Sequence, residues 1–393
     1  MKNLGLYLHI PFCQSKCPYC DFYSLDTEND YPRYANALMA QISSYSGASR
    51  DYTIDTIYIG GGTPSVIPDK IMYDILDSVY KNYKVLSDAE TTIEVNPATV
   101  NLAMLKKYRK MGINRISFGA QSMNNGELMS LGRIHNSQDV IDTYNLARKA
   151  GFDNISIDVM YGIPDQTPES LAQTLEQICD LGPEHISLYG LKIEEGTVFA
   201  VIQDELKLPD ENTEYKMYED SIKYLAKRGY SQYEISNFAK PGFESKHNLR
   251  YWLCGEYLGL GPGAHSYFNG TRFSFKRGLF SYLQCFEEPG ANVNIVDENY
   301  KISPNERVGE YIMLSLRLNR GLNTDEFKLI FGLDFEKMYQ DLLSAYIEGG
   351  FMVHRGRTYA FTTKGMFVSN YILSSMLDFD SSIEEGIANG SDK

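Results

Sequence analysis

Three of the six cysteines in this chain, Cys13, Cys17 and Cys20, lie within eight residues of one another. The other three are scattered, at Cys179, Cys254 and Cys285. Disulfides are not expected in a long chain without a secretory signal, so the clustered thiols indicate a metal or cluster site. An iron–sulfur cube takes four ligands, and three cysteines leave one iron open to a substrate or cofactor. A zinc site with three cysteines is the alternative.

The elements that must position these thiols follow a repeating pattern over residues 1 to about 200. Short strand-like runs alternate with helical patterns, which predicts a parallel sheet. The expected strands are Leu4–Ile10, Ile54–Ile59, Thr91–Val95, Arg115–Phe118, Ile155–Val159 and His185–Leu191. A doubly wound sheet and a partial barrel both fit six such units. Polar residues follow nearly every strand, and they would meet on one face in a barrel. We therefore expect an α/β fold built on a partial (β/α)6, TIM-like barrel.

The rest of the chain suggests three further segments after a core at residues 1–230. Residues 231–300 form a connecting region, and residues 301–376 show three helical patterns followed by a hairpin-like pair. That order predicts a small α+β, winged-helix-like domain. Residues 377–393 are acidic, and we expect a disordered tail there.

Composition limits the possible partners. The net charge is −14, and basic and acidic residues balance in the C-terminal module, so neither part predicts nucleic-acid binding. No apolar run is long enough to cross a bilayer, and the N-terminus does not read as a signal peptide. These features predict a cytoplasmic protein without an integral membrane segment.

The spacing C-x3-C-x2-C, with Tyr19 before the last cysteine, resembles that of the radical S-adenosylmethionine (SAM) superfamily. In that superfamily SAM chelates the open iron. Electron transfer from the cube then splits SAM into methionine and a 5'-deoxyadenosyl radical. The segments HIPFC, IYIGGGTPS, IEVNP, RISFGAQS and SIDVMYGIP look like the oxygen-independent coproporphyrinogen III oxidase-like family. The resemblance covers roughly residues 4 to 270 and the C-terminal module.

The resemblance implies a set of SAM-binding residues. Tyr7, Gly61 and Glu94 would lie near the cluster-bound SAM. Other residues match positions that hold SAM in the oxidase, including a second SAM molecule: Tyr19, Gly62, Thr63, Gln121, Arg133 and Asp158. His265 is a further candidate for SAM or heme. Without the resemblance, the glycines would be interpreted as an ordinary turn and Glu94 as an ion-pair partner. Gln121, Arg133 and Asp158 would be interpreted as loop caps.

Two departures and one motif match a branch of that family whose members are heme chaperones. Phe22 stands where the oxidase has a further cysteine, and the first strand begins close to Met1. Residues 247–252 reproduce the HNxxYW motif of the chaperone branch. The segment follows a Pro-Gly turn, so we expect it to begin in a loop where a ligand can enter.

Neutral imidazole is a standard axial ligand of heme iron, and aromatic rings pack well on a porphyrin face. We therefore expect heme binding by His247, Tyr251 and Trp252. The alternative is that Trp252 is a core anchor and that His247 only makes a loop hydrogen bond. No CxxCH motif for covalent heme attachment occurs.

The expected function is a heme chaperone that holds a 4Fe-4S cluster, SAM and heme and passes heme to an acceptor, such as a heme-dependent respiratory protein. It would also need an electron donor for the cluster. The alternative is the oxidase reaction, in which two propionates of coproporphyrinogen III are decarboxylated to vinyl groups. DNA binding by the C-terminal module is a weaker third reading.

Overall fold

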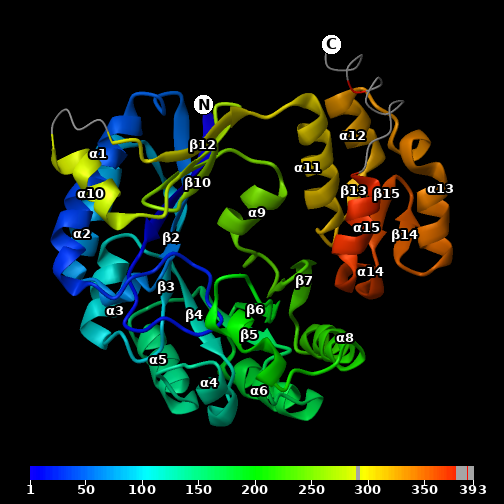
Figure 1. The fold of residues 1–393 in the computed structure, drawn as a ribbon, viewed down its shortest axis with the longest axis horizontal. Coiled ribbons are helices and arrows are strands. Elements are labelled where there is room, and N and C mark those ends of the chain that lie inside the picture. The colour runs from blue at the N-terminus through cyan, green and yellow to red at the C-terminus, as the bar shows by residue number, and fades with distance from the viewer. Residues whose placement is uncertain (289–292, 378–386, 388–393) are drawn as a thin grey trace.

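The computed structural model describes residues 1–288, 293–377 and 387 (Figure 1). Its core is a run of six parallel strands, each paired with the next in chain order. These strands are β1 (Lys2–Ile10), β2 (Tyr52–Gly61), β3 (Val85–Val95), β4 (Arg115–Gln121), β5 (Ile155–Tyr161) and β6 (His185–Gly190). The six expected strands and the partial α/β barrel are therefore confirmed.

Helices connect the strands and cover the outer side of the sheet (Figure 1). They are α1 (Tyr31–Ser46), α2 (Asp69–Asn82), α3 (Leu102–Lys110), α4 (Asn125–Ser130), α5 (Ser137–Lys149), α6 (Pro168–Leu181) and α8 (Glu211–Lys227). The short helix α7 (Val198–Val201) contacts the cysteine loop instead, where Phe199 N donates to Pro18 O at 3.1 Å. Short 3-10 turns are η1 (Glu28–Asp30), η2 (Pro64–Val66) and η3 (Gln203–Glu205). Local sequence sets several boundaries: Asn136 begins α5 with a capping box, and left-handed Gly182 ends α6.

The sheet continues beyond the six expected units at both ends. β9 (Tyr257–Leu260) runs parallel to β1, followed outward by antiparallel β10 (His265–Phe268), β11 (Thr271–Phe275) and β12 (Val296–Lys301). β8 (Asn237–Ala239) and β7 (Ser231–Glu234) extend the sheet from β6. Strands from residues 231–301 thus belong to the same sheet as the barrel strands, so the sheet does not mark a division at residue 230.

Two further helices lie within this part of the chain. α9 (Lys246–Trp252) lies between the sheet and α11 (Pro304–Leu316), and α10 (Leu279–Glu287) packs on α1 (Figure 1). The expectation that residues 247–252 begin in a loop is wrong. The Ser245 side chain accepts a hydrogen bond from Asn248 N and so caps a helix at this point.

The C-terminal domain has the expected order of elements. Three helices, α11, α12 (Thr324–Phe331) and α13 (Phe335–Glu348), precede the hairpin of β14 (Met352–Arg355) and β15 (Thr358–Phe361). β13 (Leu322–Asn323) completes a small sheet, and α14 (Thr363–Phe367) and α15 (Ser369–Met376) follow. Most of the expected tail, residues 377–393, lies outside the described residues. Among the described helices, none has the length and apolarity that a membrane span requires.

Candidate functional site

A cavity of about 400 Å³ lies at the carboxyl ends of the barrel strands. All three clustered cysteines line it, together with side chains from the ends of five different strands. The expected site residues in its wall are Cys13, Cys17, Cys20, Tyr19, Gly61, Gly62, Thr63, Glu94, Gln121, Arg133 and Asp158. Parallel strands present their carboxyl ends on one face, which explains why residues so far apart in the sequence meet here.

The cysteine loop follows β1 and folds back on itself. Cys13 N donates to Leu25 O at 3.0 Å, and Cys20 N donates to Cys17 O at 3.1 Å. The Cys13 thiol lies 3.3 Å from Thr63 Oγ1, and Arg133 Nη1 donates to Cys17 Sγ at 3.5 Å. These contacts hold the thiols against the wall of the cavity rather than in open solvent.

Three thiols can ligate three irons of a four-iron cube or, as the alternative, a single zinc ion. Within the described residues, no three His, Cys, Asp or Glu side chains are close enough to share one metal ion. A four-iron cube, by contrast, binds its cysteines at separate corners. Burial raises the pKa of the Cys20 thiol, which makes the free thiolate harder to form. Binding to a metal would offset this effect, because a coordinated thiol is deprotonated.

Gly61 and Gly62 form the turn between β2 and η2, against the cysteine loop. Gly61 has φ +114°, a conformation that residues with a Cβ rarely adopt. A Cβ on Gly62 would lie 2.4 Å from the carbonyl oxygen of Phe12, directly before Cys13. Gly62 N donates to Ile10 O at 2.8 Å. Only glycine allows the turn to pack this closely against the cysteine loop.

Glu94, near the end of β3, closes one side of this turn. Its two oxygens accept from Tyr58 OH at 2.9 Å and from Gly61 N at 3.1 Å. Burial and, to a lesser extent, the charge of Asp158 raise the pKa of Glu94 to about 7, although the two hydrogen bonds oppose the shift. The carboxyl group is therefore poised between its neutral and charged forms near neutral pH.

Arg133 brings positive charge to the cavity wall. Its Nη2 donates to Asn96 Oδ1 and to Gly119 O, both at 2.8 Å, while its Nε has no hydrogen-bond partner in the described structure. Gln121 follows a register shift in β4 and has φ +68°, a strained backbone for a residue other than glycine. Asp158 accepts from Ser117 Oγ at 3.1 Å, and burial raises its pKa. Strained and partly unpaired groups of this kind are typical of ligand sites.

Two expected SAM residues do not line the cavity. The Tyr7 hydroxyl lies 3.0 Å from His9 Nδ1, and its ring packs against Tyr58 behind the wall. His265 is exposed at the start of β10, two strands away from β1. Tyr7 would influence a ligand in the cavity only indirectly, through Tyr58 or the nearby Glu94. Burial raises the pKa of Tyr7, and the charge of Glu94 contributes a smaller part of that shift.

The HNxxYW segment lies on helix α9, which points its side chains in different directions. His247 is buried, its Nδ1 lies 2.8 Å from Thr56 Oγ1 and its Nε2 lies 2.8 Å from Tyr251 OH. Burial lowers the pKa of His247 to about 3, so the imidazole is neutral. The expectation of an accessible imidazole is therefore wrong. Trp252 is half-buried, and of the six residues only Asn248 lines the barrel cavity.

Sequence reasoning missed several residues of the cavity wall. They include Ser24, Tyr58, Arg115, Ser117, Ser187, Tyr189 and Asn248. Most lie on the barrel strands in alternation with buried apolar residues, a period-two pattern that could have identified them. Asn248 was overlooked because it belongs to the HNxxYW segment, which was interpreted only as a heme-binding motif.

Comparisons with known proteins agree with this geometry. The radical SAM superfamily model matches residues 7–178, and the HemN C-terminal domain model matches residues 302–368. The E. coli protein whose title reads "Coproporphyrinogen III oxidase (HemN)", a radical SAM enzyme, superposes with a TM-score of 0.84 at 24% identity. That match covers 96% of this chain and 90% of the other, and it shows the fold.

Relatives over nearly the full length are more similar in sequence. Heme chaperone HemW of Lactococcus lactis is 35% identical, with 96% of this chain and 98% of the relative covered. HemW of Bacillus subtilis is 33% identical, with 94% of this chain and 98% of the relative covered. HemW of Escherichia coli is also 33% identical, with 96% of this chain and 99% of the relative covered. The chain therefore belongs to the HemW family of the radical SAM superfamily.

Proposed function

We propose that this protein is a heme chaperone, which binds heme together with a cluster-bound SAM and passes heme to an acceptor protein. The observation that carries this proposal is the full-length similarity to relatives named heme chaperones. The HNxxYW segment and Phe22, where the oxidase pattern has cysteine, support it. In this proposal the protein works in the cytoplasm with an electron donor and a heme acceptor, such as a respiratory protein, as partners.

The barrel cavity has groups suited to a 4Fe-4S cluster and SAM. Cys13, Cys17 and Cys20 would ligate three irons, and the bound cluster supplies an open iron position and an electron. The Gly61–Gly62 turn lets a ligand approach the backbone closely, because no Cβ intervenes. The Glu94 carboxylate would accept a hydrogen bond from the amino group of SAM or attract its sulfonium cation, and Arg133 would offset thiolate charge beside Cys17.

Heme binding by His247, Tyr251 and Trp252 stays a prediction, and it requires a local rearrangement around His247. Both imidazole nitrogens already have partners, so His247 can reach an iron only if one of them is displaced. Tyr251 is the easier partner to move, because it is half-buried whereas Thr56 lies buried in β2.

One anaerobic experiment tests the proposal against the oxidase reaction. The cluster is reconstituted in the full chain, and the same preparation is assayed for hemin binding by Soret absorbance and for coproporphyrinogen III turnover with SAM and a reductant. The proposal expects a saturable hemin complex, heme transfer to an apo-acceptor and no protoporphyrinogen. Replacing Phe22 with Cys should not create oxidase activity. Multiple turnovers to vinyl product, or no hemin binding, would overturn the chaperone assignment.

A further inference from the structure

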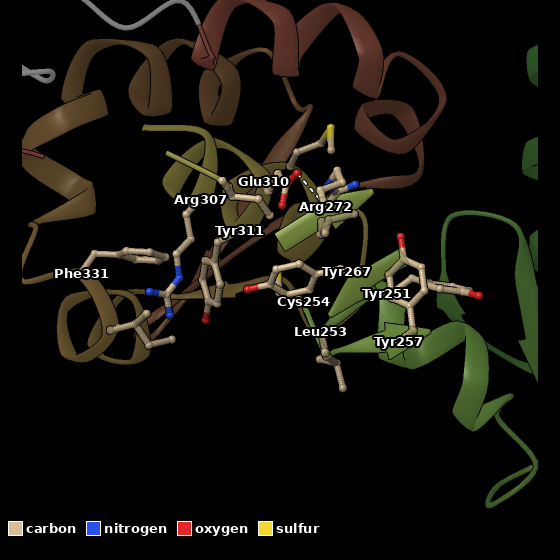
Figure 2. A pocket seen from close by; sticks show the side chains of 15 residues that line it. Tyr251, Leu253, Cys254, Tyr257, Tyr267, Arg272, Arg307, Glu310, Tyr311 and Phe331 are labelled. Atoms are coloured by element: carbon tan, nitrogen blue, oxygen red, sulfur yellow. Dashed lines mark ion pairs between the residues drawn. The ribbon is translucent and has the colours of Figure 1, made fainter. Parts of the chain in front are cut away.

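A second cavity, of about 410 Å³, lies between the sheet and the C-terminal domain (Figure 2). This volume is within the usual range of small-molecule sites. α9 contributes to both cavities: Asn248 lines the barrel cavity, and Tyr251 lines the interdomain cavity. α11 and α12 supply the facing wall with Arg307, Tyr311 and Phe331 (Figure 2). A ligand here would touch both domains at once.

Aromatic rings form both walls of the interdomain cavity. On the core side, Tyr251 and Tyr257 meet edge-on with ring centres 4.6 Å apart. On the C-terminal side, Tyr311 and Phe331 meet at 5.3 Å and an angle of 74°. At the rim, Ile330 has 46% of its surface exposed although it is apolar. Rings on two facing walls with an apolar rim are suited to a flat, largely apolar ligand.

The charged groups of this cavity favour an anionic ligand. Arg307 is exposed over the Phe331 ring, at 5.8 Å, and no ion pair holds it within the described residues. Arg272 Nη2 pairs with Glu310 Oε1 at 2.8 Å, whereas its Nε has no hydrogen-bond partner in the described structure. Two guanidinium groups thus face one carboxylate. Guanidinium groups bind carboxylates with two parallel hydrogen bonds.

Resting on the chaperone function proposed above, we propose that the interdomain cavity is the heme site, with the ring plane between Tyr251 and Tyr311 and the propionates at Arg307 and Arg272. The barrel cavity is left to the cluster and SAM. The Cys254 thiol and the tyrosine hydroxyls in the lining are of the kinds that ligate heme iron. Tyr251 also connects the site to His247, whose Nε2 is hydrogen-bonded to its hydroxyl.

Two pairs of matched variants test the location by hemin titration of the full-length protein. Ile330→Glu places a carboxylate at the rim, and Leu329→Glu places it one residue away, on a side chain that is 87% exposed and does not line the cavity. Arg307→Glu reverses a charge in the wall, and Arg320→Glu does so on an exposed residue of the same domain outside the lining. We expect the two wall variants to weaken hemin binding about tenfold and the two controls to leave it unchanged.

Protection of Cys254 from alkylation gives an independent readout on the unmodified protein. Peptide mass spectrometry should show that saturating hemin abolishes maleimide labelling of Cys254 but not of Cys285, which lies on α10 outside the cavity. Protoporphyrin without iron should protect Cys254 as well, because the rings and arginines recognise the plane and the carboxylates. If hemin bound tightly but neither wall variant weakened it and Cys254 stayed reactive, the location would be overturned while the chaperone function stood. If the wild type failed to bind hemin, both proposals would fall.

Discussion

The imidazole of His247 and the hydroxyl of Tyr251 lie 2.8 Å apart, one helical turn from each other on α9. On its other side the imidazole is hydrogen-bonded to Thr56 of β2, so His247 joins the barrel sheet to a residue of the interdomain cavity wall. Arg250, between them in the sequence, forms an ion pair with Asp55 and attaches the same helix to β2. The motif therefore fixes the position of α9 in addition to any role in heme binding.

His247→Ala should lower the free energy of unfolding by about 1–3 kcal/mol, because the buried Thr56 hydroxyl loses its partner and a buried ring is removed. Hemin affinity should fall and the Soret band should shift, since Tyr251 is no longer held. Iron content and SAM binding should survive, because His247 does not line the barrel cavity. Denaturant titration and hemin titration of the same preparation measure the two effects.

Tyr251→Phe is the informative partner of that variant. It removes the hydroxyl but keeps the ring, and so frees His247 Nε2 without leaving Thr56 unpaired. If the imidazole ligates iron after Tyr251 moves, Tyr251→Phe should tighten hemin binding and give a histidine-type Soret spectrum. Loss of binding without a spectral change would instead assign Tyr251 itself to the heme contact.

The barrel and most of its cavity could be predicted from the sequence for a physical reason. Parallel strands place their carboxyl ends together, so polar residues in the carboxyl-terminal parts of the strands converge, as Glu94, Gln121 and Asp158 do. Tyr7 does not reach the cavity, because its ring packs against Tyr58 and its hydroxyl lies beside His9 Nδ1. His265 does not reach it either, because it begins an antiparallel strand that local patterns did not reveal.

The α9 helix and the interdomain cavity depend on contacts that local sequence does not show. Lys240-Pro241-Gly242 indicates a turn, and the short segment after it has weak helical periodicity. The helix begins there because Ser245 caps it and because Glu90 of β3 accepts hydrogen bonds from Lys246 N and His247 N. Glu90 lies more than 150 residues earlier, so only the assembled sheet brings it to the helix start.

The cluster ligands can be separated from the other thiols by substitution. Replacing Cys13, Cys17 or Cys20 with Ala should reduce iron from about four atoms per reconstituted chain to near zero. Cys179→Ser, Cys254→Ser and Cys285→Ser should leave iron content unchanged, because none of these residues lines the barrel cavity. Iron and sulfide analysis with the visible absorption of the cluster provides the measurement. Loss of the cluster in a scattered-cysteine variant would contradict the three-ligand assignment.

The pKa of Glu94, about 7, predicts a pH dependence of SAM binding. Below pH 7 the carboxyl group is mostly neutral, and above pH 7 it is a carboxylate that attracts the positive charges of SAM. Affinity should therefore rise as pH increases from 6 to 8, by about tenfold if one charged hydrogen bond is gained. Equilibrium binding to the reconstituted protein across this range measures the slope.

Glu94→Gln is the control for that slope. The amide keeps the size of the side chain and one acceptor oxygen, so it can accept from Tyr58 or from Gly61 but not from both as the carboxylate does, and it does not titrate in this range. Any titration of SAM itself is common to both proteins. We expect weaker binding at pH 8 and a flatter profile in the variant, and parallel profiles would show that Glu94 does not contact a charged group of SAM.

Gly62→Ala tests whether the close packing of the glycine turn on the cysteine loop is needed. The added Cβ would lie 2.4 Å from Phe12 O, a backbone atom that cannot rotate away as a flexible side chain could. The loop beginning at Cys13 must therefore move, and we expect reduced cluster content and SAM affinity at least tenfold weaker. Gly47→Ala is the matched control, because φ is −62° there and nothing lies within 4 Å of the new methyl group. That substitution should be neutral or stabilise the fold by about 0.4–1 kcal/mol. Normal cluster content and SAM binding in Gly62→Ala would show that the cysteine loop can shift without loss of the site.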